Sequence, residues 1–283
     1  PILGSVNNIL LIEKIFTRYN IDVVFHAAAY KHVPLIEENP LEGITNNIFS
    51  SQIICKTALK FKTKKVVLIS SDKAVRPTNI MGATKRVSEL IFQSFADISN
   101  EKDSGTCFSA VRFGNVLGSS GSVVPLFKKQ ISKGGPITIT HSDIIRYFMT
   151  VKEASQLVIQ ATSMSENGDI FLLDMGQPVK IIDLAKQMIQ LSGLNVKDEH
   201  HNGDIEIKIT GIRAGEKLYE ELLIDGRSKK TEHPLIFKAD ENKIGFKEIN
   251  LILKDLEKNA SLGKVNEALD NLQKIVPEWK KKN

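Results

Sequence analysis

The sequence predicts an α/β protein with a doubly wound parallel sheet, followed by a smaller mixed α/β domain. Three apolar runs rich in β-branched residues, at 22–29, 66–70 and 107–113, alternate with stretches of helical periodicity. Such alternation is typical of a parallel sheet covered by helices. With 283 residues, 42% hydrophobic and 25% charged, the chain can bury one large or two modest cores.

The first predicted element is the end of a strand at residues 1–6. A helix follows, capped at Asn7–Asn8, with apolar side chains at helical spacing at Ile12, Ile15, Phe16 and Tyr19. Residues 22–29 are predicted to form a buried strand that ends in small side chains. A long helix, from Pro40 to about Lys60, completes this part of the chain.

The central stretch, residues 66–86, holds the strongest signal for a functional site. Its apolar strand breaks into Ser71, Asp72 and Lys73 just where it should end, and ligands of open parallel sheets bind outside the carboxyl ends of the strands. After a Pro-Thr-Asn turn, a helix is predicted from about Met81 to Ala96. Met81 and Lys85 lie one turn apart on it, so we expect all five side chains to reach one pocket.

The remaining elements are predicted from shorter signals. They are a strand at 107–113, a Gly/Ser loop at 119–123 leading into a helix, a strand at 137–140, a loop at 145–150, a helix at about 152–162, a strand at 168–176, a helix at 181–191 and amphipathic helices from Leu251 onward. The apolar spacing of the last helices predicts a structural role.

Composition narrows the class of function. The formal net charge of +5 is mild and spread along the chain, which fits an acidic small molecule such as a nucleotide diphosphate rather than a nucleic acid. Cys55 and Cys107 lack metal-ligand spacing, and the pair His200–His201 has no third ligand, so we expect no metal. No apolar run reaches the roughly 20 residues that a membrane span needs.

Two motifs carry a resemblance to a known family. Ser-Ser-Asp-Lys at 70–73 followed by Met-Gly-Ala-Thr-Lys at 81–85 resembles the extended short-chain dehydrogenase/reductase group, with Met81 in place of the usual Tyr. Within that group, residues 71–86 are similar to the membrane-anchored, CapD-like UDP-N-acetylglucosamine 4,6-dehydratases of polysaccharide biosynthesis. Arg-Ala-Gly-Glu-Lys at 213–217 resembles a second signature of the same family.

The resemblance implies a Rossmann-like fold that holds NAD in preference to NADP. The implied domains are a dinucleotide-binding domain at 1–114 and a UDP-sugar domain at 115–283, of which about 144–176 packs back on the first. The glycine-rich pyrophosphate turn of the group lies upstream of residue 1, and the chain starts without Met, so we expect an N-terminally truncated chain. The implied cofactor contacts are Ala27, Ala28, Lys31, Asn47, Lys85 and Val116.

The resemblance also implies substrate contacts in the second domain. Arg146 and Arg213 would neutralise the nucleotide phosphates, and Glu216 would accept a hydrogen bond from the ribose or uracil. Asn115 would contact the sugar, and the Gly/Ser loop with Ser119 and Ser122 would receive the diphosphate at its backbone N–H groups.

The reaction implied is a 4,6-dehydration, in which transient oxidation at C4 makes the C5 proton acidic and C6 then loses water. The catalytic residues implied are Ser71, Asp72, Lys73, Met81 and Lys85. We assign Lys73 as the base at C5 and Asp72 as the acid at C6. Since a thioether carries no exchangeable proton, Met81 leaves the O4 proton to Ser71 and its surroundings.

Other interpretations of the same residues stay open. One is a C5-inverting dehydratase or a UDP-sugar epimerase on the same scaffold. Another is a non-catalytic sugar-nucleotide-binding fragment, because the pyrophosphate turn is missing from the sequence. We expect a cytoplasmic homo-oligomer that binds a UDP-sugar and meets the cytoplasmic face of the inner membrane through an N-terminal region outside this sequence.

Overall fold

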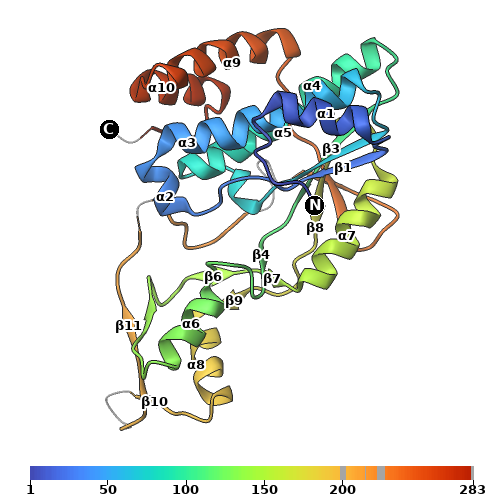
Figure 1. Cartoon of the computed structure of the whole chain (residues 1–283). Helices are drawn as coiled ribbons and strands as arrows, with labels where there is room; N and C mark the ends of the chain where they lie inside the picture. Colours follow the sequence, from blue (N-terminus) through green and yellow to red (C-terminus); the bar gives the residue numbers. More distant parts are fainter. Residues whose placement is uncertain (198–201, 214, 222–226, 282–283) are drawn as a thin grey trace. The chain divides into compact units, whose positions relative to one another are not determined.

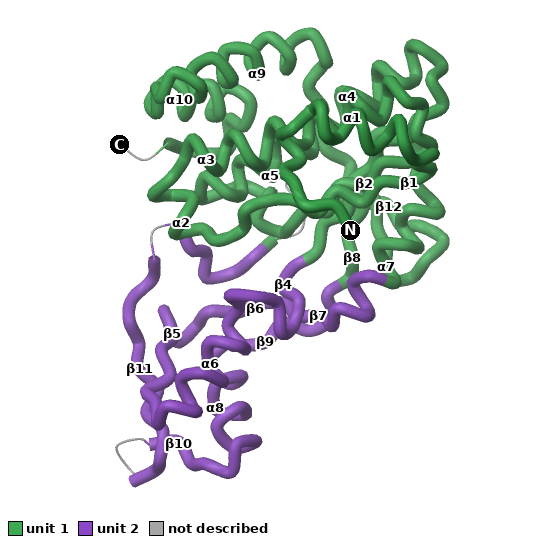
Figure 2. Tube along the Cα trace, in the orientation of Figure 1, with its two compact units in different colours: residues 1–113, 156–174, 221–283 green, residues 114–155, 175–220 purple. Residues whose placement is uncertain are grey.

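The computed structural model describes the whole chain (Figure 1) except residues 198–201, 214, 222–226 and 282–283. The chain divides into two compact units (Figure 2). Unit 1 comprises residues 1–113, 156–174 and 221–283, and unit 2 comprises residues 114–155 and 175–220. Residues 221–283 thus belong with the N-terminal part, whereas the sequence analysis assigned them to the substrate domain.

Unit 1 is built on a six-stranded sheet with a Rossmann-like α/β arrangement. The order across the sheet is β1 (Val23–His26), β2 (Lys65–Ile69), β3 (Cys107–Arg112), β8 (Ile170–Leu173), β13 (Ile236–Ala239) and β12 (Ser228–Lys230). The first four strands run parallel, and the last two pair antiparallel. The predicted α/β fold with a mostly parallel sheet is therefore confirmed.

The strands differ in how deeply they are buried. Val66, Val67 and Leu68 of β2 are almost completely buried, as their apolar run predicted. The prediction of a buried strand at 22–29 is wrong in part, because β1 lies at the edge of this sheet and exposes Val23 and Phe25. Residues 1–6 form no strand, which corrects the first predicted element.

The first helices match the predicted pattern with one irregularity. Helix α1 (Ile9–Arg18) begins at Asn8, whose side chain accepts a hydrogen bond from the Leu11 N–H. The long predicted helix is a succession of α3 (Pro40–Ile44), a π-helical turn (Thr45–Phe49) and α4 (Ser50–Lys60), after the short α2 (Val33–Glu38). π-Helical turns are frequent at functional sites, and this one carries Asn47.

Helix α5 (Ile80–Glu101) is the central helix of unit 1. The Asn79 side chain accepts from the Gly82 N–H at 2.8 Å, and Glu37 accepts from the Ile80 N–H at 2.7 Å. Gly82 is required here, since a Cβ at this position would collide with the Lys73 carbonyl oxygen. Helix α5 therefore begins in close contact with the turn that follows β2. Figure 1 shows α7 (Val151–Met164) across the sheet from α1, α4 and α5.

The C-terminal helices complete the core of unit 1. Helices α9 (Phe246–Ser261) and α10 (Val265–Ile275) contact each other and α5. Their apolar faces join the hydrophobic core that α5 forms with the sheet, through Ile249, Leu253, Leu256, Leu272 and Ile275. The predicted structural role of the tail is confirmed, and this packing explains why the tail belongs to unit 1.

Unit 2 has its own smaller core. A parallel sheet of β10 (Val196–Lys197), β11 (Ile205–Ile209) and β5 (Ile137–Ile139) packs with α6 (Val123–Ile131) and α8 (Ile181–Leu191). Two strand pairs complete the unit, β4 (Asn115–Val116) with β7 (Phe148–Met149) and β6 (Ile145–Arg146) with β9 (Val179–Lys180). The loop predicted at 145–150 thus contains two short strands. No helix among the described residues is both long and apolar enough to span a bilayer.

Candidate functional site

The carboxyl end of β2 presents the polar cluster that the sequence singled out. The Ser70 N–H donates to the Val111 carbonyl at 2.8 Å, and the Asp72 N–H donates to the Phe113 carbonyl at 3.2 Å. These bonds carry the pairing of β2 with β3 beyond the strand end. A short 3₁₀ turn, Asp72–Ala74, follows, with the Ser71 hydroxyl accepting from the Lys73 N–H. The backbone of the cluster is therefore fixed by the sheet.

Ser71, Asp72 and Lys73 form one hydrogen-bonded trio. The Ser71 hydroxyl donates to Asp72 Oδ1 at 2.7 Å, and Lys73 Nζ donates to the same oxygen at 3.0 Å. Asp72 is only 1% exposed, and its other oxygen, Oδ2, is buried and accepts no hydrogen bond from any described residue. A buried carboxyl oxygen without a donor is costly, so this atom is available to a group that a ligand brings.

Lys85 reaches the same strand end from α5. Its Nζ donates to the Ile69 carbonyl at 2.9 Å. Burial lowers the pKa of Lys85 to about 8, although the charge of Glu89 acts in the opposite direction. The structure thus brings Ser71, Asp72, Lys73 and Lys85 to the end of one strand, and a buried amine that titrates close to neutral pH is typical of functional sites.

Met81 lies in a different environment from the four polar side chains. It is 3% exposed and belongs to the hydrophobic core of unit 1, with Ile36, Ile44 and Ile48. Packing is the ordinary role of a buried methionine. A part for Met81 in catalysis stays a prediction.

Asn47 acts as a bridge inside unit 1. Its side chain accepts from the Tyr30 N–H at 2.7 Å and donates to the Tyr30 carbonyl at 3.0 Å and to the Thr84 hydroxyl at 3.0 Å. Asn47 therefore ties the loop after β1 to α5, next to Lys85. These contacts define an indirect role, and direct contact of Asn47 with a cofactor stays a prediction.

The end of β1 provides space for a flat, anionic ligand. Ala27 and Ala28 are exposed there, and small side chains let a ligand approach the backbone. Beside them lies a cavity of about 510 Å³, whose wall includes Lys31 and His32. These residues fit part of a dinucleotide, and contact of Lys31 with a phosphate or ribose stays a prediction.

A group of charged residues that the sequence did not predict lies behind the cluster. Ser70 donates from its hydroxyl to Glu89 Oε1 at 2.6 Å, and Arg112 pairs with Glu89 in the interior. The available signal was Arg112 itself, a charged side chain at the end of an apolar strand. Gly82 was missed as well, because only the structure shows that α5 contacts the turn after β2.

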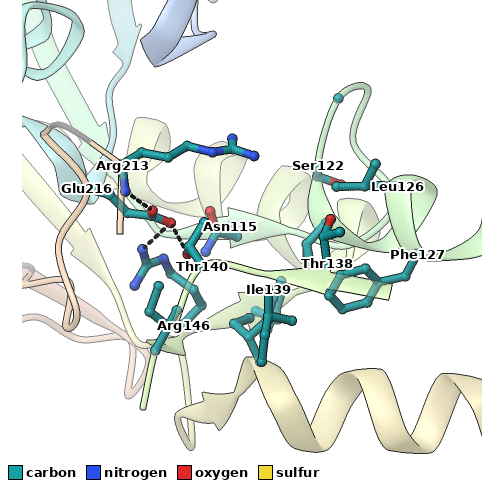
Figure 3. Close-up of a pocket in the computed structure, with 15 residues that line it drawn as sticks. Asn115, Ser122, Leu126, Phe127, Thr138, Ile139, Thr140, Arg146, Arg213 and Glu216 are labelled. Atoms are coloured by element: carbon teal, nitrogen blue, oxygen red, sulfur yellow. Dashed lines mark hydrogen bonds and ion pairs between the residues drawn. The ribbon is translucent and has the colours of Figure 1, made fainter. Parts of the chain in front are cut away.

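Unit 2 contains a cavity of about 220 Å³ (Figure 3). Five of the six residues predicted to bind substrate line it: Asn115, Ser122, Arg146, Arg213 and Glu216. Ser119 and Val116 are not among its lining residues in the described part of the chain. The Ser122 hydroxyl is buried and has no hydrogen-bond partner among the described residues, so it is open to a ligand.

Arg146 holds the loop that carries the Arg213–Lys217 motif. Its Nη1 donates to the carbonyls of Ile145 at 2.8 Å and Leu218 at 3.1 Å, and its Nη2 donates to the Lys217 carbonyl at 2.8 Å. Its side chain is 11% exposed and lies between 3.7 and 3.9 Å from the carboxylates of Glu216 and Glu220. The guanidinium predicted to bind phosphate is thus largely used within the protein.

Glu216 and Arg213 differ in how far their side chains remain available to a ligand. Glu216 accepts from the Thr140 hydroxyl at 3.0 Å and from the Arg213 N–H at 3.2 Å, so both of its oxygens already brace the loop. The Arg213 side chain is exposed, and Figure 3 shows it extending away from Glu216 and Arg146. Arg213 is therefore the cation of this cavity that a phosphate can reach most readily. The predicted pair His200–His201 lies outside the described residues.

Comparison with known proteins adds independent information. Residues 1–241 match the family described as "Polysaccharide biosynthesis protein". The capsular polysaccharide biosynthesis protein CapD of Staphylococcus aureus is 48% identical over 94% of this chain and 43% of its own length. An inverting UDP-N-acetylglucosamine 4,6-dehydratase of Campylobacter jejuni is 38% identical over 71% of the chain and 56% of its own length. The chain thus spans about half the length of these relatives.

Solved structures agree on the fold. The X-ray structure of Pen from Bacillus thuringiensis has a TM-score of 0.75 and 36% identity, covering 89% of this chain and 81% of that one. DesIV, a dTDP-glucose 4,6-dehydratase from Streptomyces venezuelae with NAD and TYD bound, has a TM-score of 0.66 and 17% identity, covering 77% and 69%. At that identity, the second likeness concerns the fold alone.

Proposed function

Because the chain belongs to the polysaccharide biosynthesis protein family, we propose that it is a nucleotide-sugar 4,6-dehydratase of polysaccharide or glycan biosynthesis. The substrate proposed is UDP-N-acetylglucosamine, and the product is the UDP-4-keto-6-deoxy sugar. The observation that carries the proposal is the trio Ser71, Asp72 and Lys73, joined by Lys85 at the same strand end. A dehydratase needs an acid and a base side by side, and the trio supplies both.

The Lys73–Asp72 hydrogen bond holds the proposed base and the proposed acid side by side. Lys73 Nζ lies 3.0 Å from Asp72 Oδ1, and the neutral Lys73 amine acts as the base while Asp72 acts as the acid once the O4 proton has reached it. Lys73 then takes the proton from sugar C5, while Asp72 gives its proton to the C6 oxygen, which leaves as water.

Ser71 closes the proton cycle. When C4 is oxidised, the Ser71 hydroxyl can accept the O4 proton and pass its own to Asp72 Oδ1, 2.7 Å away. Asp72 is thereby protonated for its step at C6, and Lys73 returns its proton to C5, so the cycle begins and ends with an Asp72 carboxylate and a neutral Lys73 amine. Lys85 lowers the energy of the developing O4 anion when its amine is protonated.

A nicotinamide cofactor, when bound, supplies the hydride acceptor for C4 and the hydride donor for C6. Lys85 would hold its ribose, and Ala27, Ala28 and Lys31 at the end of β1 would contact the rest of the dinucleotide. Their small exposed side chains and the adjacent cavity support this assignment. DesIV, which shares the fold, binds NAD, and we propose NAD here in preference to NADP.

The cavity of unit 2 is proposed to hold the UDP moiety. Arg213 would pair with the diphosphate, while Arg146 and Glu216 hold its loop in place. Asn115 and the buried hydroxyl of Ser122 would bind polar groups of the substrate. The division leaves binding to unit 2 and proton transfer to unit 1.

The second candidate is a C5-inverting dehydratase, which the name of the 38% identical relative favours. Met81, in place of a tyrosine, favours retention of C5. An epimerase is the weaker alternative, because it needs no acid at C6 and no base at C5. One experiment separates all three: NMR of the product formed from UDP-N-acetylglucosamine with NAD in deuterated water.

The expected product is a 4-keto-6-deoxy sugar with retained C5 configuration and deuterium at C5. Inversion at C5 would replace the first candidate by the second. A C4 epimer without deuterium would favour the epimerase, and unchanged substrate that nevertheless binds would favour the non-catalytic binding fragment.

A further inference from the structure

Four charged side chains lie together in the interior of unit 1: Arg86 and Glu89 on α5, Arg112 at the end of β3, and Glu241 after β13. We name them the charge network. Arg112 donates to both oxygens of Glu89 at 2.6 Å each, and to both oxygens of Glu241 at 2.6 and 2.8 Å. Arg86 Nη1 lies 3.1 Å from Glu89 Oε2 and 3.0 Å from Glu241 Oε2. Each cation thus meets both anions.

The network stays charged despite its burial. Burial alone would lower the pKa of Arg112, but the charge and hydrogen bonds of Glu89, and those of Glu241, raise it above its ordinary value. Burial alone would raise the pKa of Glu89, but Arg112, Arg86 and Ser70 lower it. Well-packed apolar side chains can often replace such a network without loss of stability, so stability is a weak explanation for its presence.

The network connects directly to the candidate active site through Ser70. The Ser70 hydroxyl donates to Glu89 Oε1 at 2.6 Å, and Ser70 immediately precedes Ser71. One helical turn earlier on α5, Lys85 Nζ donates to the carbonyl of Ile69. Lys85 and Glu89, one turn apart on α5, therefore bond to two successive residues at the end of β2. These are Ile69 and Ser70.

The network also reaches the C-terminal segment. Glu241 follows β13, Arg86 Nη2 donates to the Asn242 carbonyl at 3.4 Å, and Arg86 Nε lies 3.7 Å from a carboxyl oxygen of Glu278. Glu241, Asn242 and Glu278 lie outside the motifs at 71–86 and 213–217. A segment remote in sequence thus anchors the cations that hold Glu89.

We propose that Ser70 and the charge network are positioning residues of the candidate active site, which fix the strand end and so the orientation of Ser71, Asp72 and Lys73. Glu89 holds Ser70, Arg112 and Arg86 hold Glu89, and Glu241 holds both arginines. None of them is among the residues assigned above to catalysis or binding. The proposal rests on the proposed function for its kinetic consequences, but its structural consequence can be measured without turnover.

The test compares Ser70→Ala with Ser94→Ala. Ser94 is also buried, lies on α5, and donates to the Ile91 carbonyl of its own helix. The readout is hydrogen exchange of the amides of residues 69–76, compared with those of β8. Ser70→Ala should speed exchange at 69–76 by about tenfold and leave β8 unchanged. Ser94→Ala should leave both segments as in the wild type.

The kinetic readout separates positioning from binding. Ser70→Ala should lower kcat by about ten- to a hundredfold with KM changed by no more than about twofold, because a displaced acid–base pair affects the transition state and leaves the nucleotide contacts intact. Glu241→Gln keeps Ser70 and removes one charge at the far end. It should produce a smaller change in the same amides.

Two results would overturn the proposal. One is exchange at 69–76 that is the same in Ser70→Ala and the wild type. The other is a uniform rise that includes β8, which would mean a purely structural role. If the wild type forms no dehydrated product, the proposed function fails while exchange still decides this point; if Ser70→Ala turns over at the wild-type rate, positioning fails and the proposed function stands.

Discussion

The strand-end cluster of unit 1 and the cavity of unit 2 use their polar side chains in different ways. In the cluster, Ser71, Asp72 and Lys73 bond to one another, and Asp72 keeps one buried oxygen that no described residue donates to. In the cavity, Arg146 and Glu216 bond mainly to the loop around them, and Arg213 extends from it exposed. The proposed function assigns proton transfer to the cluster and nucleotide binding to the cavity.

Burial is the physical reason for the difference. Burial lowers the pKa of the Lys85 amine to about 8, so this group can exchange protons near neutral pH. An exposed guanidinium keeps its charge and can pair with a phosphate. The comparison predicts that substitutions in the cluster change kcat and that substitutions in the cavity change affinity.

The largest effect is expected for Lys73→Ala and Asp72→Asn. Removing the proposed base or the proposed acid should lower kcat by about a hundred- to ten-thousandfold, and UDP-sugar binding should change little because the proposed binding contacts belong to unit 2. Steady-state rates and a calorimetric titration with UDP measure the two quantities. Weaker UDP binding with unaltered kcat would show that the cluster binds the nucleotide and does not act on kcat.

The next largest effect is expected from His26 of unit 1, and it is a loss of folding stability at acid pH. Burial, and to a smaller extent the charge of Lys85, lowers the pKa of His26 from 6.5 to about 4, while its ring bonds to Ser51 at 3.1 Å. Between pH 6.5 and about 4, His26 therefore binds a proton in the unfolded chain but not in the folded chain. The contribution of His26 to the free energy of unfolding is fully present above pH 6.5. About 3 kcal/mol of it is lost as the pH falls towards about 4.

The measurement is the free energy of urea unfolding as a function of pH, for the wild type and His26→Gln. The variant should lack this part of the pH dependence. His32, which is exposed, serves as the matched control in His32→Gln. Equal slopes for the wild type and His26→Gln would show that another group governs the acid sensitivity of unit 1.

Arg213→Ala and Arg146→Ala sharpen the comparison inside unit 2. Loss of a charge-assisted contact should weaken UDP binding by about ten- to a hundredfold in Arg213→Ala, with an unchanged melting temperature. Arg146→Ala removes the hydrogen bonds from its guanidinium to the carbonyls of Lys217 and Leu218, so it should lower the melting temperature. If Arg146→Ala weakens UDP binding without any loss of stability, Arg146 contacts the phosphates after all.

The smallest effect is expected for Met81→Leu. Both side chains are apolar and similar in volume, so the free energy of unfolding should change by less than about 1.5 kcal/mol. Thermal or urea unfolding measures it directly. A much larger loss would mean that Met81 has a contact that leucine cannot supply, which would bring it closer to the cluster than its place in the core indicates.

The sequence predicted the parallel sheet, helix α8 and the end of β2 because each depends on local pattern. Apolar runs and helical spacing report burial of neighbouring residues, and a polar break after a buried strand reports the sheet edge. The same logic failed for β1. Its apolar run is like that of β2, but its place at the edge of this sheet is a property of the strand order.

What the sequence could not predict depends on contacts between remote segments. Glu241 and the helices α9 and α10 lie far from β3 in sequence, so nothing local assigned them to unit 1. Arg146 matched a phosphate-binding pattern, yet its donors meet carbonyls some seventy residues later in the chain. A motif names the residue type, and the surrounding backbone decides how its donors are used.

The most direct test of the central claim is the deuterium content at C5 of the product formed in deuterated water by the wild type and by Lys73→Ala. With the wild type, we expect a 4-keto-6-deoxy product that carries deuterium at C5. With Lys73→Ala we expect almost no product and no C5 exchange in recovered substrate. Deuterium at C5 at the wild-type rate in Lys73→Ala would show that another group is the base and would contradict the account.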